Sequence, residues 1–184
     1  MADTRDRILE IARALVREGG PQALSFDAIA ERLGKSKQAV LYWLPNKGAL
    51  LSALYLPWLA AESEAAEAAL AEVEGEAEAV AAFVRAVAAF HLADLERFRL
   101  TYLAPQLASL RVEAGTLGEI NATTGRLYAA LAARLEGEDA RTRALAVHSA
   151  VIGLVTMVAL ADALGDPLKA GTEALVEALV ATLA

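Results

Sequence analysis

Two short amphipathic segments joined by a tight turn constrain this chain most strongly; they lie in SFDAIAERLGKSKQAVLYWLPNKGALL, residues 25 to 51. In the first segment apolar residues stand at Phe26 and at offsets of 3, 4 and 7 residues from it, which predicts a helix of about two turns. Gly34 ends this helix, because glycine is common just beyond a helix C-terminus. Ser36 is a suitable N-cap for the second segment, and Pro45 ends it because proline disfavours helix in the residue before it. The stretch therefore predicts two short helices separated by a turn.

The rest of the chain is predicted to be helical as well. It is 57% hydrophobic and 22% charged, and its 5 prolines and few aromatic residues favour an all-α globular protein over a sheet-rich or disordered one. We expect two domains, residues 1–46 and residues 47–184. The apolar periodicity predicts about nine helices, which include segments at about 4–18, 47–73, 76–103, 120–135, 139–164 and 168–183 and a short helix between Pro105 and Gly115. Within the second of the long segments, AAESEAAEAALAEVE at residues 60–74 is expected to face solvent.

Charge is distributed unevenly along the chain. The net charge is −7, yet residues 1–50 hold 8 Lys and Arg against 6 Asp and Glu, whereas the other 134 residues hold 9 against 18. Affinity for nucleic acid depends on cations that face phosphates rather than on the charge of the whole chain. The acidic balance therefore does not exclude DNA as a partner of the N-terminal region.

The two short segments have the geometry of a helix-turn-helix, in which the second helix enters the major groove of DNA. In that second helix Val40 and Leu44 form an i, i+4 pair that would pack inward, which turns the opposite side outward. On the outward side the amide of Gln38 can pair with adenine, and Lys37 can reach guanine or a phosphate. These two residues are the candidates for reading bases.

Phosphate anchors are expected beside the reading helix. Ser25 offers a hydroxyl, and Lys47 stands at a helix N-terminus, where backbone amides and the helix dipole already favour an anion. Each residue also has a plainer interpretation, with Ser25 and Ser36 as caps only and with Lys35, Lys37 and Lys47 as solvated charges. The grouping of these residues, rather than any one of them, favours DNA binding.

The residues LSFDAIAERLGKSKQAVLYWLPNKGALLSAL, at 24–54, resemble the TetR family of transcriptional regulators, in which an apolar helix ending in Gly, a Ser-centred turn, an aromatic-rich helix and a Pro/Lys junction follow one another. Two positions depart from that pattern. Lys35 replaces an apolar residue, and Leu41 stands where many members carry a phosphate-contacting tyrosine, so that this contact would pass to either Tyr42 or Trp43. The resemblance implies a DNA-contacting set of Ser25, Lys35, Ser36, Lys37, Gln38, Leu41, Tyr42, Trp43 and Lys47.

Beyond about residue 60 the resemblance implies a helical domain that binds a small molecule and forms a homodimer, here through residues 139–183. Two recognition helices would then occupy successive major grooves, roughly 34 Å apart, on a near-palindromic operator. A largely apolar effector that prefers another conformation would release the DNA, which makes the expected output repression. The candidate residues for lining the effector pocket are Trp58, Phe90, His91, Phe98, Tyr102, Tyr128, His148 and Met157. An aromatic stripe at this spacing also fits residues that simply form the hydrophobic core.

Other classes of function receive less support from the sequence. A helical carrier or enzyme without DNA binding is the alternative, but no nucleophile motif, phosphate-binding glycine loop or HExxH sequence predicts catalysis, and we expect no cofactor and no metal site. The 18 residues from Ala144 to Ala161 carry no charge and approach membrane-spanning length. Their Gly, Ser, Thr and His residues favour instead a helix buried by its own core and by a second subunit. Because the chain has no cysteine and no secretory signal, we expect a cytoplasmic protein without a membrane partner.

Overall fold

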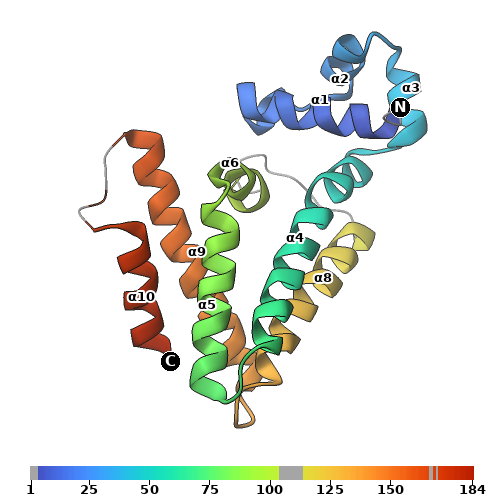
Figure 1. The fold of residues 1–184 in the computed structure, drawn as a ribbon. Coiled ribbons are helices and arrows are strands. Elements are labelled where there is room, and N and C mark those ends of the chain that lie inside the picture. Colours follow the sequence, from blue (N-terminus) through green and yellow to red (C-terminus); the bar gives the residue numbers. More distant parts are fainter. Residues whose placement is uncertain (1–3, 104–113, 166–167, 169) are drawn as a thin grey trace. The chain divides into compact units, whose positions relative to one another are not determined.

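The computed structural model describes residues 4–103, 114–165, 168 and 170–184. Over these residues the chain is all-helical, with nine α-helices, which confirms the predicted fold class (Figure 1). Two compact units form: unit 1 comprises Met1–Leu59 and Glu96–Asn121, and unit 2 comprises Ala60–Leu95 and Ala122–Ala184. The units therefore divide within the long helix α4 (Lys47–Ala71), whereas the domain boundary predicted from the sequence lies just before this helix.

Unit 1 is built around three N-terminal helices and the first half of α4. Helix α1 (Thr4–Gly19) is followed by a single 3₁₀ turn, η1 (Pro21–Ala23), and then by α2 (Phe26–Leu33) and α3 (Lys37–Trp43). Ile8, Ile29 and Val40, one from each α-helix, are fully buried and meet in one apolar cluster with Leu50 and Leu54 of α4. This core holds the two short helices in place, because helices of about two turns are not stable alone.

The helix expected over residues 76–103 is interrupted, so this prediction is wrong in its length. Helix α5 (Glu76–Leu92) ends, and α6 (Leu95–Phe98) and a π-helical segment, η2 (Arg99–Leu103), follow it. The amide of Asp94 donates to the carbonyl of His91, three residues back, which tightens and ends the preceding helix. The apolar spacing continues through the break, so periodicity alone does not reveal it. The short helix expected between residues 105 and 115 lies mostly outside the described residues.

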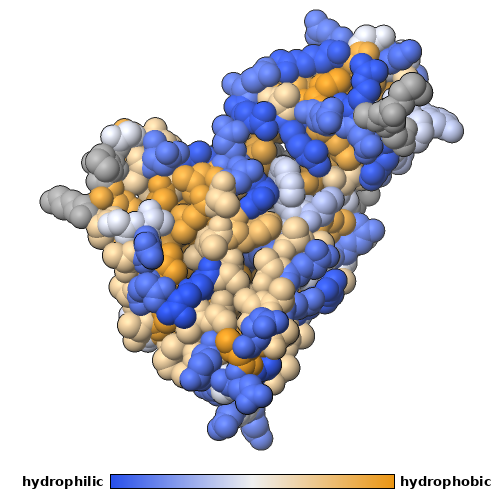
Figure 2. All heavy atoms as spheres, in the orientation of Figure 1, coloured by the Kyte–Doolittle hydropathy of each residue, from blue (hydrophilic) through white to orange (hydrophobic). Residues whose placement is uncertain are grey.

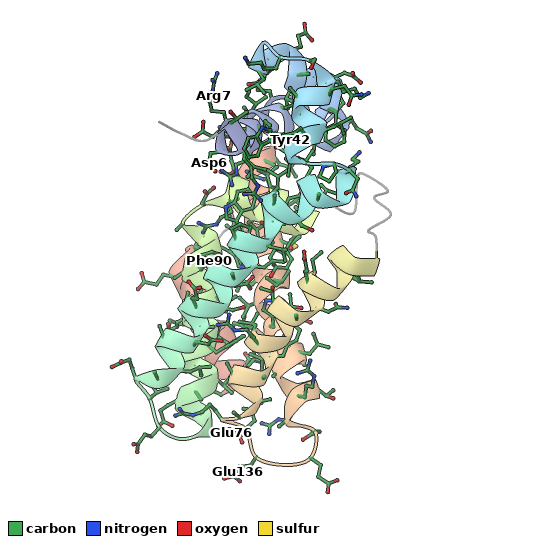
Figure 3. The ribbon with its side chains drawn as sticks, turned by 90° about the vertical axis from the view of Figure 1, so that its right-hand side faces the viewer. Asp6, Arg7, Tyr42, Glu76, Phe90 and Glu136 are labelled. Atoms are coloured by element: carbon green, nitrogen blue, oxygen red, sulfur yellow. The ribbon has the colours of Figure 1, made fainter. Side chains whose placement is uncertain are left out.

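Unit 2 is a bundle in which α5, α9 (Ala140–Leu164) and α10 (Thr172–Leu183) pack side by side (Figure 1). The second half of α4 is joined to α8 (Ala114–Ala132) by an ion pair between Glu67 and Arg126, at 2.8 Å. At one end of the unit the backbone amide of Glu136 donates to the carboxylate of Glu76 at 2.6 Å (Figure 3). The fully buried side chains of this core include Phe83, Leu127, Leu131 and Val151.

Helix α9 carries large apolar side chains that the described residues of the chain leave exposed. It is the one helix in the described part of the chain that is long and apolar enough to cross a membrane, and 33% of its most apolar 18-residue window is buried. Figure 2 shows apolar surface over α5 and α10 and around the C-terminal end of α9, in contrast to the largely hydrophilic surface of unit 1. The exposed large apolar side chains of α9 are Leu145, Met157, Leu160 and Leu164.

Candidate nucleic-acid interface and buried polar core

Three side-chain caps lie at the starts of α2, α3 and α4. Ser25, Ser36 and Asn46 accept hydrogen bonds from backbone amides three residues further on, at 3.1, 3.3 and 2.7 Å respectively. The first two confirm the caps expected from the sequence. Gly34 ends α2 in the left-handed conformation, with φ 67° and ψ 33°. The turn between α2 and α3 is therefore specified by local hydrogen bonds and by one glycine.

One side of α3 is buried and the other faces solvent. Val40 and Leu44 are 0% and 2% exposed and pack inward, as their spacing predicted. Lys37 and Gln38 are exposed on the outer side, and Tyr42 is 81% exposed (Figure 3). A helix that presents one polar side in this way has the form required to enter a major groove, which is about one helix wide.

The other predicted DNA-contacting residues lie around the same helix. Lys35 and Lys47 are exposed before and after α3, whereas Leu41 is half-buried. Trp43 is 37% exposed and its ring lies edge-to-face against the ring of Tyr42, with 5.5 Å between the ring centres. The structure thus gathers the whole predicted set on unit 1, and Tyr42 is the more accessible of the two aromatic residues that could contact a phosphate.

Lys37 is paired with an acidic residue of the preceding helix. Its ammonium lies 2.8 Å from the carboxylate of Asp27, the second residue of α2, and both side chains are about half exposed or more. Exposed ion pairs of this kind contribute little to stability, so a DNA phosphate or a guanine can compete for the lysine. The sequence spacing did not reveal this pair, because it depends on the angle between α2 and α3.

A buried polar group occupies the core of unit 2, and we refer to its three side chains, Glu62, His91 and His148, as the acidic node. Oε1 of Glu62 lies 2.8 Å from Nε2 of His148 on α9 and 3.1 Å from Nε2 of His91 on α5. All three side chains are 5% exposed or less. On the far side of His148, the hydroxyl of Tyr128 lies 3.4 Å from Nδ1. One carboxylate oxygen of α4 therefore holds imidazoles from two other helices.

The carboxyl group of Glu62 is ionised despite its burial. Burial alone would raise its pKa, but hydrogen bonds from His148 and His91 and the attraction of these two rings outweigh burial and lower the pKa to about 2. Perturbed carboxylates of this kind are concentrated at functional sites.

The acidic node corrects one expectation from the sequence. Residues 60–74 were expected to face solvent, but Glu62 and Ser63 are 1% and 0% exposed, and Ala66 and Leu70 are also buried. Residues 62, 66 and 70 recur every four positions and form the inner side of α4. The abundance of Ala and Glu concealed this stripe, and its spacing from the apolar Leu59 was the signal that could have revealed it.

The eight predicted ligand-lining residues fall into both compact units. In unit 1, the ring of Trp58 lies under the guanidinium of Arg13 at 5.3 Å, and Phe98 and Tyr102 are stacked with ring centres 5.4 Å apart. In unit 2, the acidic node joins His91 and His148, and the node contacts Tyr128. The ring of Phe90 is half-buried beside that of His91, and Met157 is 56% exposed on α9.

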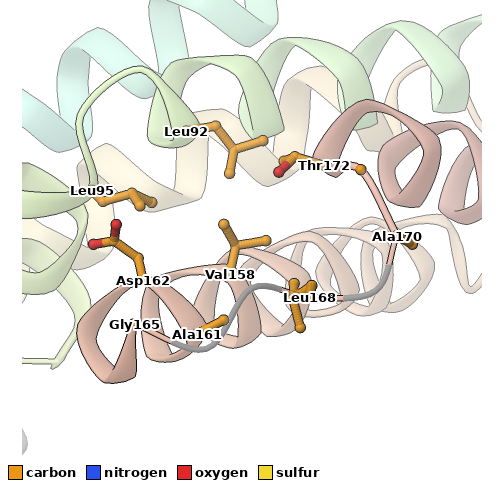
Figure 4. A pocket seen from close by; sticks show the side chains of 10 residues that line it. Leu92, Leu95, Val158, Ala161, Asp162, Gly165, Leu168, Ala170 and Thr172 are labelled. Carbon is orange, nitrogen blue, oxygen red and sulfur yellow. The ribbon is translucent and has the colours of Figure 1, made fainter.

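Unit 2 also contains a hollow of about 770 Å³ between α5, α9 and the start of α10 (Figure 4). Its walls are mainly apolar, and the side chains of Asp162 and Thr172 point into it (Figure 4). None of the eight predicted residues is among those that line it, which are Leu92, Leu95, Val158, Ala161, Asp162, Gly165, Leu168, Ala170, Gly171 and Thr172. Within the described ranges, no group of three His, Asp or Glu residues is arranged to hold a metal ion.

Comparisons with known proteins agree with this arrangement. Residues 8–54, which contain α1 to α3 and the start of α4, match the family model described as bacterial regulatory proteins of the tetR family. A comparison with curated protein sequences found no match.

Solved structures share the fold over nearly the whole chain. The TetR family transcriptional regulator PfmR from Thermus thermophilus is 24% identical, with a TM-score of 0.70 over 97% of this chain and 97% of that one. FadR from Bacillus subtilis, crystallised in complex with stearoyl-CoA, is 18% identical, with a TM-score of 0.73 over 97% and 96%. The fatty acid degradation regulator FadR from Bacillus halodurans is 16% identical, with a TM-score of 0.73 over 100% and 95%. At these identities the likeness establishes the fold and nothing finer.

Proposed function

We propose that this chain, whose residues 8–54 place it among the bacterial regulatory proteins of the tetR family, is a regulator of transcription. It binds DNA, and it does so in response to a small molecule. The finer parts of the proposal are that it is a cytoplasmic repressor, that it binds a near-palindromic operator as a homodimer, and that the effector releases it from DNA. The activity proposed is binding rather than catalysis.

The observation that carries the proposal is the two-sided character of α3. Val40 and Leu44 anchor one side in the core of unit 1, while Lys37, Gln38 and Tyr42 project from the other. In the proposed complex Gln38 and Lys37 read base edges, and Tyr42 and Lys47 contact phosphates. Ser25, Lys35, Ser36, Leu41 and Trp43 complete the contact surface.

The effector is proposed to bind within the helical unit 2. His91, Tyr128 and His148 offer polar contacts there, and Phe90 lies beside them. Trp58, Phe98, Tyr102 and Met157 remain predictions for the lining, although the structure places the first three in unit 1 and Met157 at the surface of α9. The FadR of Bacillus subtilis was crystallised with stearoyl-CoA, so a long-chain acyl-CoA is one effector class to test.

The dimer is proposed to form through residues 139–183. The exposed apolar side chains of α9 support this proposal, because a monomeric protein rarely leaves a large apolar patch in water.

Selection of bound duplexes from a random pool, with the full-length protein at two salt concentrations, tests the proposed function. We expect enrichment of an inverted repeat, and an affinity that falls by about three orders of magnitude or more between about 50 and 200 mM salt if six or more phosphates are contacted. A pool that emerges without any enriched sequence, together with affinity that does not depend on salt, would instead favour the helical carrier or enzyme without DNA binding.

A further inference from the structure

The three lysines around the outer side of α3 are not equivalent. Lys37, the first residue of α3, donates to the carboxylate of Asp27 at 2.8 Å. Lys35 and Lys47, in contrast, form no ion pair with any described residue. Asp27 lies in the first turn of α2, two residues after Ser25, which is itself a predicted phosphate contact. A carboxylate therefore stands beside the candidate DNA surface, where phosphates would repel it.

The pair between Lys37 and Asp27 contributes little to the fold. Its side chains are 49% and 73% exposed, and exposed ion pairs add little stability. The angle between α2 and α3 is fixed instead by Gly34 in the turn and by buried side chains of both helices, among them Leu33 and Val40. What the pair controls is the position of the Lys37 ammonium and the charge that it presents to DNA.

Asp27 changes what Lys37 can bind. A lysine ammonium is a compact charge on a flexible stem, with three N–H donors. A lysine that is free to move binds any phosphate within its reach, which adds affinity for every DNA sequence. While Lys37 donates one hydrogen to Asp27, its other donors remain available, but its charge is offset and its attraction for phosphates is reduced. A guanine edge in the major groove presents two acceptors, O6 and N7, to such donors.

We infer that Asp27 is a specificity-determining residue of the candidate DNA interface, because its carboxylate restrains Lys37 so that the lysine discriminates between bases and adds little to the binding of arbitrary DNA. This inference rests on the proposed function, since it concerns the same interface. Specificity is a difference between two affinities, and a group that disfavours the wrong partner increases it. On a duplex without a suitable base, Lys37 can leave for a phosphate only by exposing Asp27 to the phosphates around it, which opposes binding.

Asp27→Asn tests the inference, because it removes the charge and keeps the size of the side chain. Fluorescence anisotropy measures the affinity of the full-length protein for a selected operator, for a panel in which each base pair of that operator is replaced in turn, and for an unrelated duplex. We expect the affinity for the unrelated duplex to rise about two- to fivefold, and its salt slope to increase by up to about one, as Lys37 becomes free to neutralise a phosphate. The operator should gain less, so that the ratio of the two affinities falls.

Glu31→Gln is the matched control. Glu31 lies one helical turn further along α2 than Asp27 and is exposed as well, so the substitution removes the same charge from the same helix. We expect Glu31→Gln to keep the wild-type ratio of the affinities for operator and unrelated duplex.

Lys37→Met separates the pair from other effects of Asp27. It removes the ammonium and keeps an unbranched side chain, at an exposed position. Once Lys37 is replaced, Asp27→Asn should no longer change the ratio of the two affinities. An effect of Asp27 on the α2 dipole, or a general repulsion of DNA, does not depend on Lys37 and would persist in the double variant.

Three results would overturn the inference and leave the proposed function in place. They are an unchanged ratio of affinities in Asp27→Asn, an equal fall of this ratio in Glu31→Gln, and a fall of the same size with and without Lys37. If Asp27→Asn does not fold, Lys37→Met decides: we expect it to reorder the operator panel, and an unaltered ranking would show that Lys37 reads no base. Selection of a sequence by the wild-type protein, with salt-dependent affinity, tests the proposed function separately.

Discussion

Gly34 turns the chain between α2 and α3 in a left-handed conformation that residues with a side chain rarely adopt, with φ 67°. Nothing lies within 4 Å of the place where a Cβ would stand, so substitution brings a conformational cost and no collision. We expect Gly34→Ala to lower the free energy of unfolding by about 1–2 kcal/mol. Urea denaturation measures this loss, and Gly34→Asn should recover part of it because asparagine tolerates this conformation. Equal stability of all three proteins would contradict the assigned geometry.

Gln38 and Lys47 are expected to affect DNA binding in different ways. An amide that reads a base edge changes sequence preference when it is removed, whereas a lysine on a phosphate affects all sequences alike. Gln38→Ala should therefore reorder a panel of operator variants, and Lys47→Ala should weaken every member and reduce the salt slope by about one. Fluorescence anisotropy at several salt concentrations measures both effects. An unchanged ranking in Gln38→Ala would remove Gln38 from the base-reading set.

Glu62 makes the free energy of unfolding depend on pH in the acidic range. Its pKa is lowered from 4.5 to about 2 in the folded state, so its ionisation stabilises the fold above pH 4.5, and this contribution is lost as the pH falls from 4.5 through about 2. The full contribution is on the order of 3 kcal/mol. We expect the decrease in unfolding free energy between pH 6 and pH 3 to be smaller in Glu62→Gln than in the wild type. Chemical denaturation at the two pH values measures it, and an identical decrease would show that Glu62 is not ionised in the folded core.

The helices whose ends are set by neighbouring residues could be predicted from the sequence. The bounds of α2 and α3 depend on Ser25, Gly34, Ser36 and the residues around Pro45, all within or next to the helices themselves. The set of outward-facing residues on α3 followed from the spacing of Val40 and Leu44, whose burial the structure confirms. Local caps and a helical period are therefore sufficient to locate the candidate DNA surface.

Features that depend on distant residues were not predictable. Glu62 and His148 are 86 positions apart, and nothing near either residue in the sequence marks the other as its partner. A glutamate within an Ala/Glu-rich helix is normally solvated, because burial of a single carboxylate is unfavourable unless partners are present. Those partners come from α5 and α9, and the packing of these helices on α4 was not available from periodicity alone. The pair between Lys37 and Asp27 was missed for the same reason.

The exposed face of α9 leads to a prediction at the level of the element. Leu160 is 50% exposed on this face, and a charge there would lie within the proposed dimer interface. We expect Leu160→Glu to raise the dissociation constant of the homodimer by at least about tenfold, since a charge buried without a partner is costly. Sedimentation equilibrium measures the change. Ala129→Glu, at an exposed position of α8, is the control and should leave the dimer intact.

The same face distinguishes a dimer from a membrane-bound protein. If α9 inserts into a bilayer, wild-type protein will be found in the membrane fraction and will require detergent for extraction. If α9 pairs with a second copy, the protein will be recovered in the soluble fraction as a dimer.

For the molecule as a whole, the two proposed functions are divided between two chemically different regions of one chain. Residues 1–50 have an excess of basic residues and carry the candidate DNA surface, whereas the remainder is strongly acidic and contains a buried carboxylate. Helix α4 contributes residues to both units, so a rearrangement at Glu62 acts on a helix that also forms part of the core beneath α3. Such a rearrangement would weaken operator binding only in a dimer, because the two recognition helices of a dimer must fit their half-sites at the same time.

The spacing of the two half-sites should therefore control affinity. In the proposed complex the two α3 helices lie roughly 34 Å apart, about one turn of DNA. Insertion of five base pairs between the half-sites of a selected operator moves one half-site by half a turn, to the opposite face of the duplex. We expect the affinity to fall to that of a single half-site, whereas changes of base identity in the spacer at constant length should have little effect. Titration of the three duplexes at one salt concentration measures the difference, and equal binding of the lengthened operator would show that the subunits bind DNA independently.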